Sequence, residues 1–374
     1  MKKRAILQVA DTGPLESLVL MLESAGYECL LPGERLRNWM REIGMDCVLD
    51  VEDLIHWMGY SRPLCKLQEA DLSTMKFANV GKDAVPTILV DVKAHRSYSK
   101  IVKEWPNFAG RVLWYRINGG KPEHVVKDLG GGAKYDAGDE VNPPCPVLTP
   151  NQWYGNGLVE TTPVERTEGF KTKQPCPSYT CWPPFLRFNN MQDKYPRITG
   201  QYTPPICLIH NIEGWGYRDL MPSLQEIGVG MYGRGSPNGC MTWEESMKRL
   251  SKSIAMVHLK SSDAPGYALY EALTLGVPVI CTRRLIWRCR MQDLLIPGVT
   301  CLTFDRETHD GLTPEDVRNC VAEVRHHLDY LYAPETNRKI GEAGRNRLRE
   351  IMWSETRESD VESLKKFMAT HFGA

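Results

Sequence analysis

The sequence has neither an excess of charge nor a long apolar run. Its 46 basic and 46 acidic residues give a formal net charge of zero, which argues against a protein that holds nucleic acid through long-range charge alone but does not exclude a local basic groove. No apolar run approaches the roughly 20 residues that cross a bilayer, so we expect no membrane span. The opening stretch, MKKRAILQVADTG, has basic residues before an apolar run, but that run is short and lacks a small-residue cleavage site. We therefore expect a first strand here rather than a signal peptide.

Metal-binding and disulfide spacings are missing as well. The 12 cysteines are scattered and mostly lie inside apolar runs, and the closest pair, Cys176 and Cys181, does not have the C-x-x-C spacing of a zinc site. We expect buried thiols in a reduced, cytoplasmic protein, in the host cytoplasm if the source is viral. The chain also has no internal repeat and no low-complexity tract.

The length of the chain and its alternating pattern predict two domains. A chain of 374 residues suits two domains of roughly 150–200 residues each. Strand-like runs such as RAILQVA and PTILVDVK alternate with helix-like runs such as PLESLVLMLESAGY, and a second such series begins at PPICLIHNI. Strands and helices in this order form a parallel sheet with helices on both faces. In the second series, Thr242 and Glu245 have the spacing of a capping box at a helix start.

The predicted fold class is α/β, with two Rossmann-like doubly wound parallel-sheet domains that face one another across a cleft. We expect an N-terminal domain over residues 1–200 with a loop-rich insertion, a second domain over residues 201–350, and a C-terminal helix over residues 351–374 that packs back toward the N-terminal domain. Ligands of such sheets bind at the carboxyl ends of the strands. Residues 119–201 are rich in Gly, Pro, Asn and aromatics, which is typical of loops that either line a substrate site or pack against the first domain.

One segment carries the strongest functional signal. The run SSDAPGYALYEALTLGVPVICTRR has an acid at Asp263, seven further residues, a second acid at Glu271, and a helix-like run that leads into a buried strand. It resembles the donor-binding segment of retaining glycosyltransferases with the GT-B fold, of the family 4 type, and the resemblance covers roughly residues 205–305. Asp263 stands where that family usually has Glu. The resemblance implies transfer of a sugar from a nucleotide-diphosphate donor, a UDP-sugar rather than a GDP-sugar, with retention of configuration. It also implies that residues 1–200 form the acceptor domain and residues 201–350 the donor-binding domain.

The two acids suit a sugar nucleotide chemically. A carboxylate accepts hydrogen bonds from two sugar hydroxyls, and the resemblance assigns Asp263 to the transferred sugar and Glu271 to the ribose hydroxyls. The turn at Pro265 and Gly266 lets backbone amides point toward a ligand, and Tyr267 opens a helix whose first amides suit an anion. The alternative is an ordinary acid near a helix N-terminus, where negative charge is stabilising.

The leaving diphosphate needs a positive partner. Many glycosyltransferases use a metal ion held by an Asp-x-Asp triplet, and the sequence has no such triplet. We therefore expect a metal-independent enzyme without a cofactor, in which arginines donate bidentately to phosphate. The candidates are Arg218, Arg234 and Arg283, with Arg284 as an alternative to Arg283. For each of them, a solvated surface charge is the competing interpretation.

The first domain contributes weaker candidates. His95 directly follows the strand-like run TILVDVK, and in related enzymes a histidine in a comparable place contacts the donor sugar, so we include it with the catalytic candidates. Gly13 lies at the first strand–helix turn, where a glycine lets a ligand approach the backbone. Packing or turn roles are the alternatives for both residues, and no side-chain base is evident.

The acceptor side has little signal. Aromatic residues in or near loops of the first half stack on sugars and on nucleobases alike; they are Trp105, Trp114, Trp153, Tyr154 and Trp182. The expected acceptor is a glycan or glycoconjugate, or a hydroxymethylated base in phage-type double-stranded DNA. Two further hypotheses stay open, a nucleotide-sugar epimerase of the same fold and a nucleotide-sugar-binding module without turnover.

Overall fold

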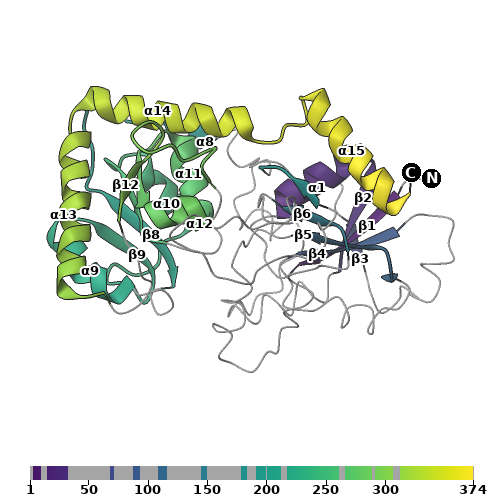
Figure 1. The fold of residues 1–374 in the computed structure, drawn as a ribbon, viewed down its shortest axis with the longest axis horizontal. Helices are drawn as coiled ribbons and strands as arrows, with labels where there is room; N and C mark the ends of the chain where they lie inside the picture. The colour runs from purple at the N-terminus through teal and green to yellow at the C-terminus, as the bar shows by residue number, and fades with distance from the viewer. Residues whose placement is uncertain are drawn as a thin grey trace. The chain divides into compact units, whose positions relative to one another are not determined.

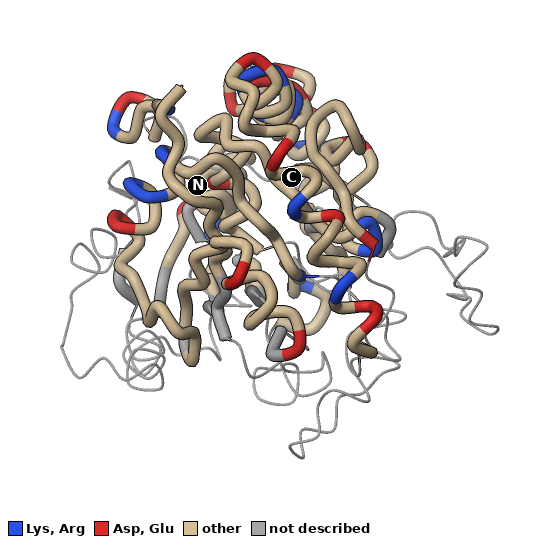
Figure 2. Tube along the Cα trace, turned by 90° about the vertical axis from the view of Figure 1, so that its left-hand side faces the viewer, with Lys and Arg blue, Asp and Glu red and all other residues tan. Residues whose placement is uncertain are grey.

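The computed structural model describes a large part of the chain, which Figure 1 draws as helices and strands. The described residues are 3–9, 15–32, 68–70, 87–92, 108–115, 145–149, 178–182, 191–198, 200–211, 217–260, 266–288, 291–305 and 312–373. Along this trace, Lys and Arg positions are interspersed with Asp and Glu positions (Figure 2). The neutral net charge therefore reflects a mixture of signs in the described part of the chain and not a division into basic and acidic blocks.

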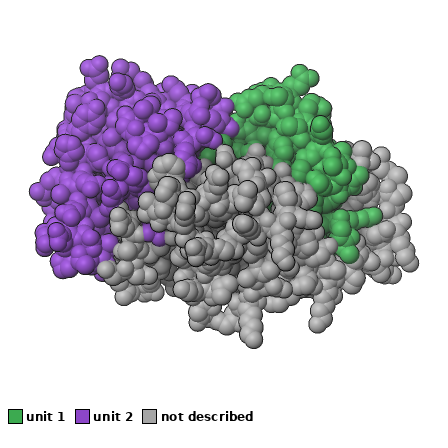
Figure 3. Space-filling model, viewed as in Figure 1, with its two compact units in different colours: residues 1–186, 352–374 green, residues 187–351 purple. Residues whose placement is uncertain are grey.

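The chain forms two compact units, one made of residues 1–186 with 352–374 and the other of residues 187–351 (Figure 3). The chain thus leaves the first unit and returns to it at its end. The units divide earlier than residue 200, because the segment 191–198 packs within the second unit.

A seven-stranded parallel sheet forms the centre of the first unit, in the order β3-β2-β1-β4-β5-β6-β7. The strands are β1 (Lys3–Val9), β2 (Tyr27–Pro32), β3 (Gln68–Ala70), β4 (Thr87–Val92), β5 (Val112–Tyr115), β6 (Val147–Thr149) and β7 (Ser178–Thr180). The described helices are α1 (Leu15–Ser24), between β1 and β2, and α15 (Glu358–Phe372), at the end of the chain. The strand order reverses between β1 and β4, which is where doubly wound sheets bind their ligands.

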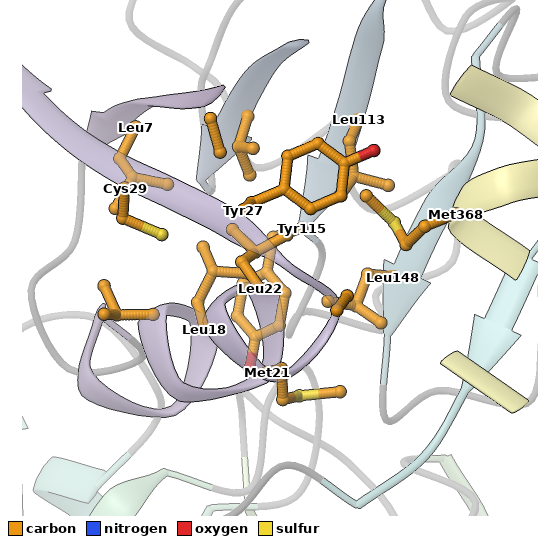
Figure 4. Packing of buried hydrophobic residues seen from close by; sticks show 14 of the residues in the cluster. Leu7, Leu18, Met21, Leu22, Tyr27, Cys29, Leu113, Tyr115, Leu148 and Met368 are labelled. Atoms are coloured by element: carbon orange, nitrogen blue, oxygen red, sulfur yellow. The ribbon is translucent and has the colours of Figure 1, made fainter. Parts of the chain in front are cut away.

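Both faces of this sheet are buried, as is usual for parallel strands. Leu7 of β1 packs with Leu18 and Leu22 of α1 and with Met368 of α15 in one core cluster (Figure 4). Ile6, one position earlier in β1, is also buried, and since successive side chains of a strand point to opposite faces it belongs to the other side of the sheet. The continuous apolar sequence of β1 is explained by this two-sided burial.

The second unit contains a five-stranded parallel sheet in the order β12-β11-β10-β8-β9. Its strands are β8 (Ile206–Asn211), β9 (Gly230–Arg234), β10 (Met256–His258), β11 (Val279–Thr282) and β12 (Leu302–Phe304). Its helices are α8 (Met191–Lys194), α9 (Tyr217–Glu226), α10 (Trp243–Leu250), α11 (Tyr267–Leu275), α12 (Arg283–Arg288), α13 (Pro314–Leu331) and α14 (Pro334–Ile351). In Figure 1, α9 and α13 lie on one side of the sheet and α10 and α11 on the other. The strand order reverses between β8 and β10.

The predicted α/β class with two doubly wound parallel sheets is confirmed, whereas the cleft between them stays a prediction. The capping box at the start of α10 is also confirmed: Thr242 Oγ1 accepts from the Glu245 N–H at 3.2 Å, and Glu245 Oε2 accepts from the Thr242 N–H at 2.9 Å. Within the part of the chain that the structure describes, no helix has the length and apolarity that crossing a membrane would require.

Candidate functional site

The carboxyl ends of the strands form one edge of the second sheet. β8 ends at Asn211 and β9 at Arg234, and these two residues are Cα partners, so the two strand ends lie side by side. β10 pairs with the opposite side of β8, and the loop after its last residue, His258, leaves the sheet where the strand order reverses. In doubly wound sheets a ligand meets the strand ends at this position.

Helix α11 begins at this edge, and its N-cap is Gly266. Gly266 has a φ of 80°, which favours glycine because an L side chain is strained there, and a Cβ added to it would lie 3.9 Å from Cε1 of His258. Tyr267, the first helical residue, is partly buried. The first turn of α11, all of it described, contains no acidic residue. The partial positive charge of this helix end therefore meets no carboxylate from its own first turn, which suits a bound anion.

Glu271 lies one turn further into α11 and is enclosed, with only 6 % of its surface exposed. Its Oε1 accepts a hydrogen bond of 2.8 Å from Nε1 of Trp243, the first residue of α10. Burying a carboxylate is costly unless hydrogen bonds replace the lost water, and a bond to an ionised acceptor is stronger than a neutral one. The site candidate is therefore fixed by a contact between two helices, and it does not lie on an open surface.

The segment 191–198 supports α10 at both of its ends. Near the start of the helix, the Tyr195 ring meets the Trp243 ring edge-on, with centroids 6.0 Å apart and an interplanar angle of 79°. At the other end, Arg197 Nη1 donates to the carbonyl oxygen of Ser251 at 2.9 Å, where the negative end of the helix dipole favours a cation. Burial lowers the pKa of Arg197 to about 10, so this side chain is charged at neutral pH.

The three arginine candidates lie at the same edge of the second sheet. Arg218 is in the first turn of α9, Arg234 ends β9, and Arg283 opens α12 directly after β11. The side chains of Arg218 and Arg234 fall outside what the structure describes. Arg283 Nε is 3.2 Å from Asp305 Oδ1, and both side chains are 54 % exposed. An ion pair this exposed contributes about 0–1 kcal/mol, so Asp305 competes only weakly with another anion for Arg283.

The remaining candidates lie outside the described residues; they are Gly13, His95, Asp263 and Pro265. The strands that lead to them are described. Val9 at the end of β1 pairs with Val92 at the end of β4, so the segments after β1 and β4 leave the first sheet at adjacent strand ends. The segment between Lys260 and Gly266 connects the carboxyl end of β10 to the N-cap of α11.

The described ranges contain no group of three or more His, Cys, Asp or Glu side chains that could hold a metal ion. The cysteines in these ranges are free thiols, and most of them are buried. Burial raises the pKa of the Cys207 thiol to about 12, which keeps it protonated and makes it a poor metal ligand. Metal independence stays a prediction.

The whole chain is similar in fold to several solved glycosyltransferases. Sucrose-phosphate synthase from Thermosynechococcus elongatus aligns over 99 % of both chains with a TM-score of 0.58 and 13 % identity. An alpha-glucosyltransferase solved with UDP-glucose and DNA containing an abasic site aligns over 98 % of this chain and 99 % of its own, with a TM-score of 0.57 and 9 % identity. The fold is GT-B. HepE from Anabaena, solved with UDP and glucose, aligns over 99 % of both chains with a TM-score of 0.53 and 11 % identity.

The likeness to GT-B structures shows the architecture and not the reaction, because the identities are low. No protein-family model matches the sequence, and no curated protein sequence matches it. The sequence resemblance covers only roughly residues 205–305, whereas the similarity in fold covers almost the whole chain.

The sequence patterns did not reveal two side chains of the second unit that contact one another near Glu271, Trp243 and Tyr195. The capping box at Thr242 identifies where α10 begins, and so places Trp243 at the first helical position. Nothing in that pattern indicates that the indole reaches an acid 28 residues later. Tyr195 lies in a segment that the sequence assigned to the first domain.

Proposed function

We propose that the protein is a glycosyltransferase that moves a sugar from a UDP-sugar to an acceptor hydroxyl, with retention of configuration and without a metal ion. The observation that carries the proposal is the placement of Glu271, an enclosed and hydrogen-bonded carboxylate on the helix that follows the reversal point of the second sheet in a GT-B fold. Ligands of doubly wound sheets bind at this edge, and a carboxylate there can accept hydrogen bonds from the hydroxyls of a nucleotide.

The acids and the first-domain candidates bind the sugar parts of the donor in this proposal. Glu271 accepts hydrogen bonds from the ribose hydroxyls, and Asp263, in the loop between β10 and α11, accepts them from the transferred sugar. His95 contacts the same sugar from the segment after β4, and Gly13 lets the donor approach the backbone after β1.

The positive groups at the edge of the second sheet bind the diphosphate. Arg218, Arg234 and Arg283 donate to its oxygens, and the helix N-terminus at Gly266 and Tyr267 adds backbone amides, with Pro265 shaping the turn before it. As the bond to the sugar breaks, negative charge grows on the diphosphate. Fixed positive groups therefore stabilise the transition state more than the ground state.

The sugar transfer can be written with all bonds, electrons and protons accounted for and without a side-chain base. The acceptor oxygen forms a bond to the anomeric carbon while the bond from that carbon to the phosphate oxygen breaks. The bonding electrons leave with UDP, and the hydroxyl proton passes to the departing phosphate on the same face of the sugar. The donor choice is supported by two fold neighbours, one solved with UDP-glucose and one with UDP and glucose.

The donor side is tested by incubating the protein with UDP- and GDP-sugars and weighing the products. Glu271→Gln is the sharpest variant, because the amide oxygen still accepts from Trp243 while the NH₂ group cannot accept from ribose. We expect it to stay folded and to lose at least about 10-fold in kcat/KM, which corresponds to one lost charge-assisted hydrogen bond. Glu226→Gln, at an exposed position at the end of α9, serves as the matched control and keeps full activity. Full activity of a folded Glu271→Gln variant removes Glu271 from the site.

The acceptor is identified in the same assay by offering glycans or double-stranded DNA with hydroxymethylated bases. A DNA acceptor gives binding that falls steeply with salt, whereas a small glycan acceptor gives little salt dependence. Product made from the free nucleotide sugar alone, with an inverted sugar centre, identifies an epimerase instead. Binding of UDP without any product identifies a binding module. Activity that survives EDTA is expected from the metal-independent mechanism.

A further inference from the structure

The hydrogen bond between Trp243 and Glu271 joins two helices at the candidate site. Trp243 Nε1 lies 2.8 Å from Glu271 Oε1, and an indole N–H is a donor only, so its partner is the acceptor without ambiguity. A carboxylate has about four lone-pair sites, so one donor does not exhaust it. The bond instead fixes the plane of the carboxylate, whose terminal torsion is otherwise broad.

Trp243 is itself held from two directions. The capping box at Thr242 fixes the backbone at the start of α10, and Tyr195 packs edge-on against the indole ring. Tyr195 is buried, so the ring that braces Trp243 is not free to move into solvent. The indole N–H is therefore aimed at Glu271 by the fold itself.

We propose that Trp243 is a positioning residue, which orients the Glu271 carboxylate so that it meets the ribose hydroxyls of the donor. This inference rests on the proposed function, since it assigns a role to the neighbour of Glu271. A carboxylate ordered before the ligand arrives avoids the loss of side-chain freedom on binding. Trp243 thus acts on ribose recognition without touching the donor.

Trp243→Phe tests this role because it keeps an aromatic ring at this position and removes the N–H. It also makes the ring system smaller, a loss that the control variant shares. The matched control is Trp353→Phe, which deletes another indole bond, from Nε1 to the Asp360 carbonyl oxygen at 3.2 Å, in the other unit. The readout is the ratio of the dissociation constants of 2′-deoxy-UDP and UDP, measured by calorimetry on the full chain. This ratio reports ribose recognition, which a general loss of stability does not change.

We expect wild type to bind UDP about 10-fold more tightly than 2′-deoxy-UDP, and Glu271→Gln to lose this preference. Trp243→Phe should lower the ratio at least about threefold and raise KM for the donor with little change in kcat, which is the pattern of lost ground-state binding. Trp353→Phe should leave the ratio unchanged. In the Glu271→Gln background, Trp243→Phe should have no further effect on the ratio, because the two residues act as a unit.

Two results would overturn the inference, and they differ in what they say about the proposed function. If Glu271→Gln loses the preference for UDP while Trp243→Phe keeps it, Glu271 retains its assigned role and Trp243 has none. If wild type binds no UDP or shows no preference between the two nucleotides, the ribose-binding role of Glu271 is wrong and the positioning role falls with it.

Discussion

At the scale of single residues, Gly341 decides how closely α14 approaches the end of α11. A Cβ at Gly341 would overlap the carbonyl oxygen of Gly276 and lie 2.8 Å from its carbonyl carbon. Helix propensity alone favours alanine over glycine by about 1 kcal/mol. A backbone carbonyl cannot turn aside as a flexible side chain can, so we expect the overlap to dominate.

Gly341→Ala should lower the free energy of unfolding by about 1–3 kcal/mol, the usual cost of overpacking, measured by urea denaturation. Asn346→Ala, at an exposed position on the same helix, is the control and should change stability by less than about 0.5 kcal/mol. A Gly341→Ala variant as stable as wild type would show that the two helices do not approach this closely.

The buried hydroxyl of Tyr27 should make the stability of the folded state depend on pH in the alkaline range. Its side chain is buried, its hydroxyl has no hydrogen-bond partner among the described residues, and burial raises the pKa of Tyr27 to about 12. An unfolded tyrosine ionises near pH 10. The folded state therefore holds this proton longer, and the stability that it contributes below pH 10 is lost as the pH rises toward 12.

Tyr27→Phe should accordingly lose stability less steeply than wild type between pH 10 and 12, as followed by thermal unfolding at a series of pH values. Tyr330→Phe, at a position that is 54 % exposed, should follow the wild-type curve. Parallel curves for Tyr27→Phe and wild type would mean that this hydroxyl reaches water.

The sequence predicted one half of the central contact of the site and missed the other. Glu271 stands out because its spacing from Asp263 matches a known pattern, and the pattern needs no three-dimensional information. Trp243 does not stand out, because its role depends on how α10 crosses α11. A contact between helices of different sequence position is a property of packing, which no local pattern reports.

At the scale of elements, the largely buried guanidinium of Arg197 holds the C-terminal end of α10. Arg197 donates from Nη1 to the Ser251 carbonyl at 2.9 Å and from Nη2 to Asn337 Oδ1 at 2.9 Å. Both partners are neutral acceptors, and the guanidinium can donate to both at once because it has several N–H groups. Its removal leaves buried acceptors without donors.

We expect Arg197→Met to lower the free energy of unfolding by about 2 kcal/mol or more, since each bond from a charged donor contributes about 1.5–3 kcal/mol. Arg197→Lys should recover only a part of this loss, because one ammonium cannot reach all the acceptors. Lys252→Met, an exposed position beside the same helix end, should have little effect in the same urea titration. Equal losses for Arg197→Met and Lys252→Met would contradict the role of Arg197.

Most elements could be predicted from sequence, but some of the short ones could not. β1, α10 and α13 have apolar patterns or capping signals long enough to recognise. β7 has three residues, too few to show a period of two, and it lies in the stretch that composition marked as loops. The segment 191–198 was also assigned to the wrong unit from sequence. Its helix α8 has only four residues, so only its contacts in the structure show that it belongs to the second unit.

At the scale of the whole molecule, the chain closes its first unit with its last helix. Leu364 and Met368 of α15 belong to the same core cluster as α1 and the first sheet. The amphipathic pattern of α15 indicates that one of its faces is buried, but it does not say against which unit. The expected return of the C-terminal helix to the first domain therefore has no local signal in the sequence, because the contacts that it makes are far apart along the chain.

The last prediction follows from this discontinuous unit. Leu364→Ala removes a fully buried side chain from the core that α15 shares with α1, which typically costs about 2–5 kcal/mol. Because no described residue of 187–351 belongs to this cluster, we expect the loss to be local. Hydrogen exchange measured by mass spectrometry should show faster exchange in α1 and β1 and unchanged exchange in β10 and β11. Lys366→Ala, exposed on the same helix, should change neither. Faster exchange in both units would mean that they unfold as one, and unchanged exchange in α1 would mean that α15 does not stabilise the first core.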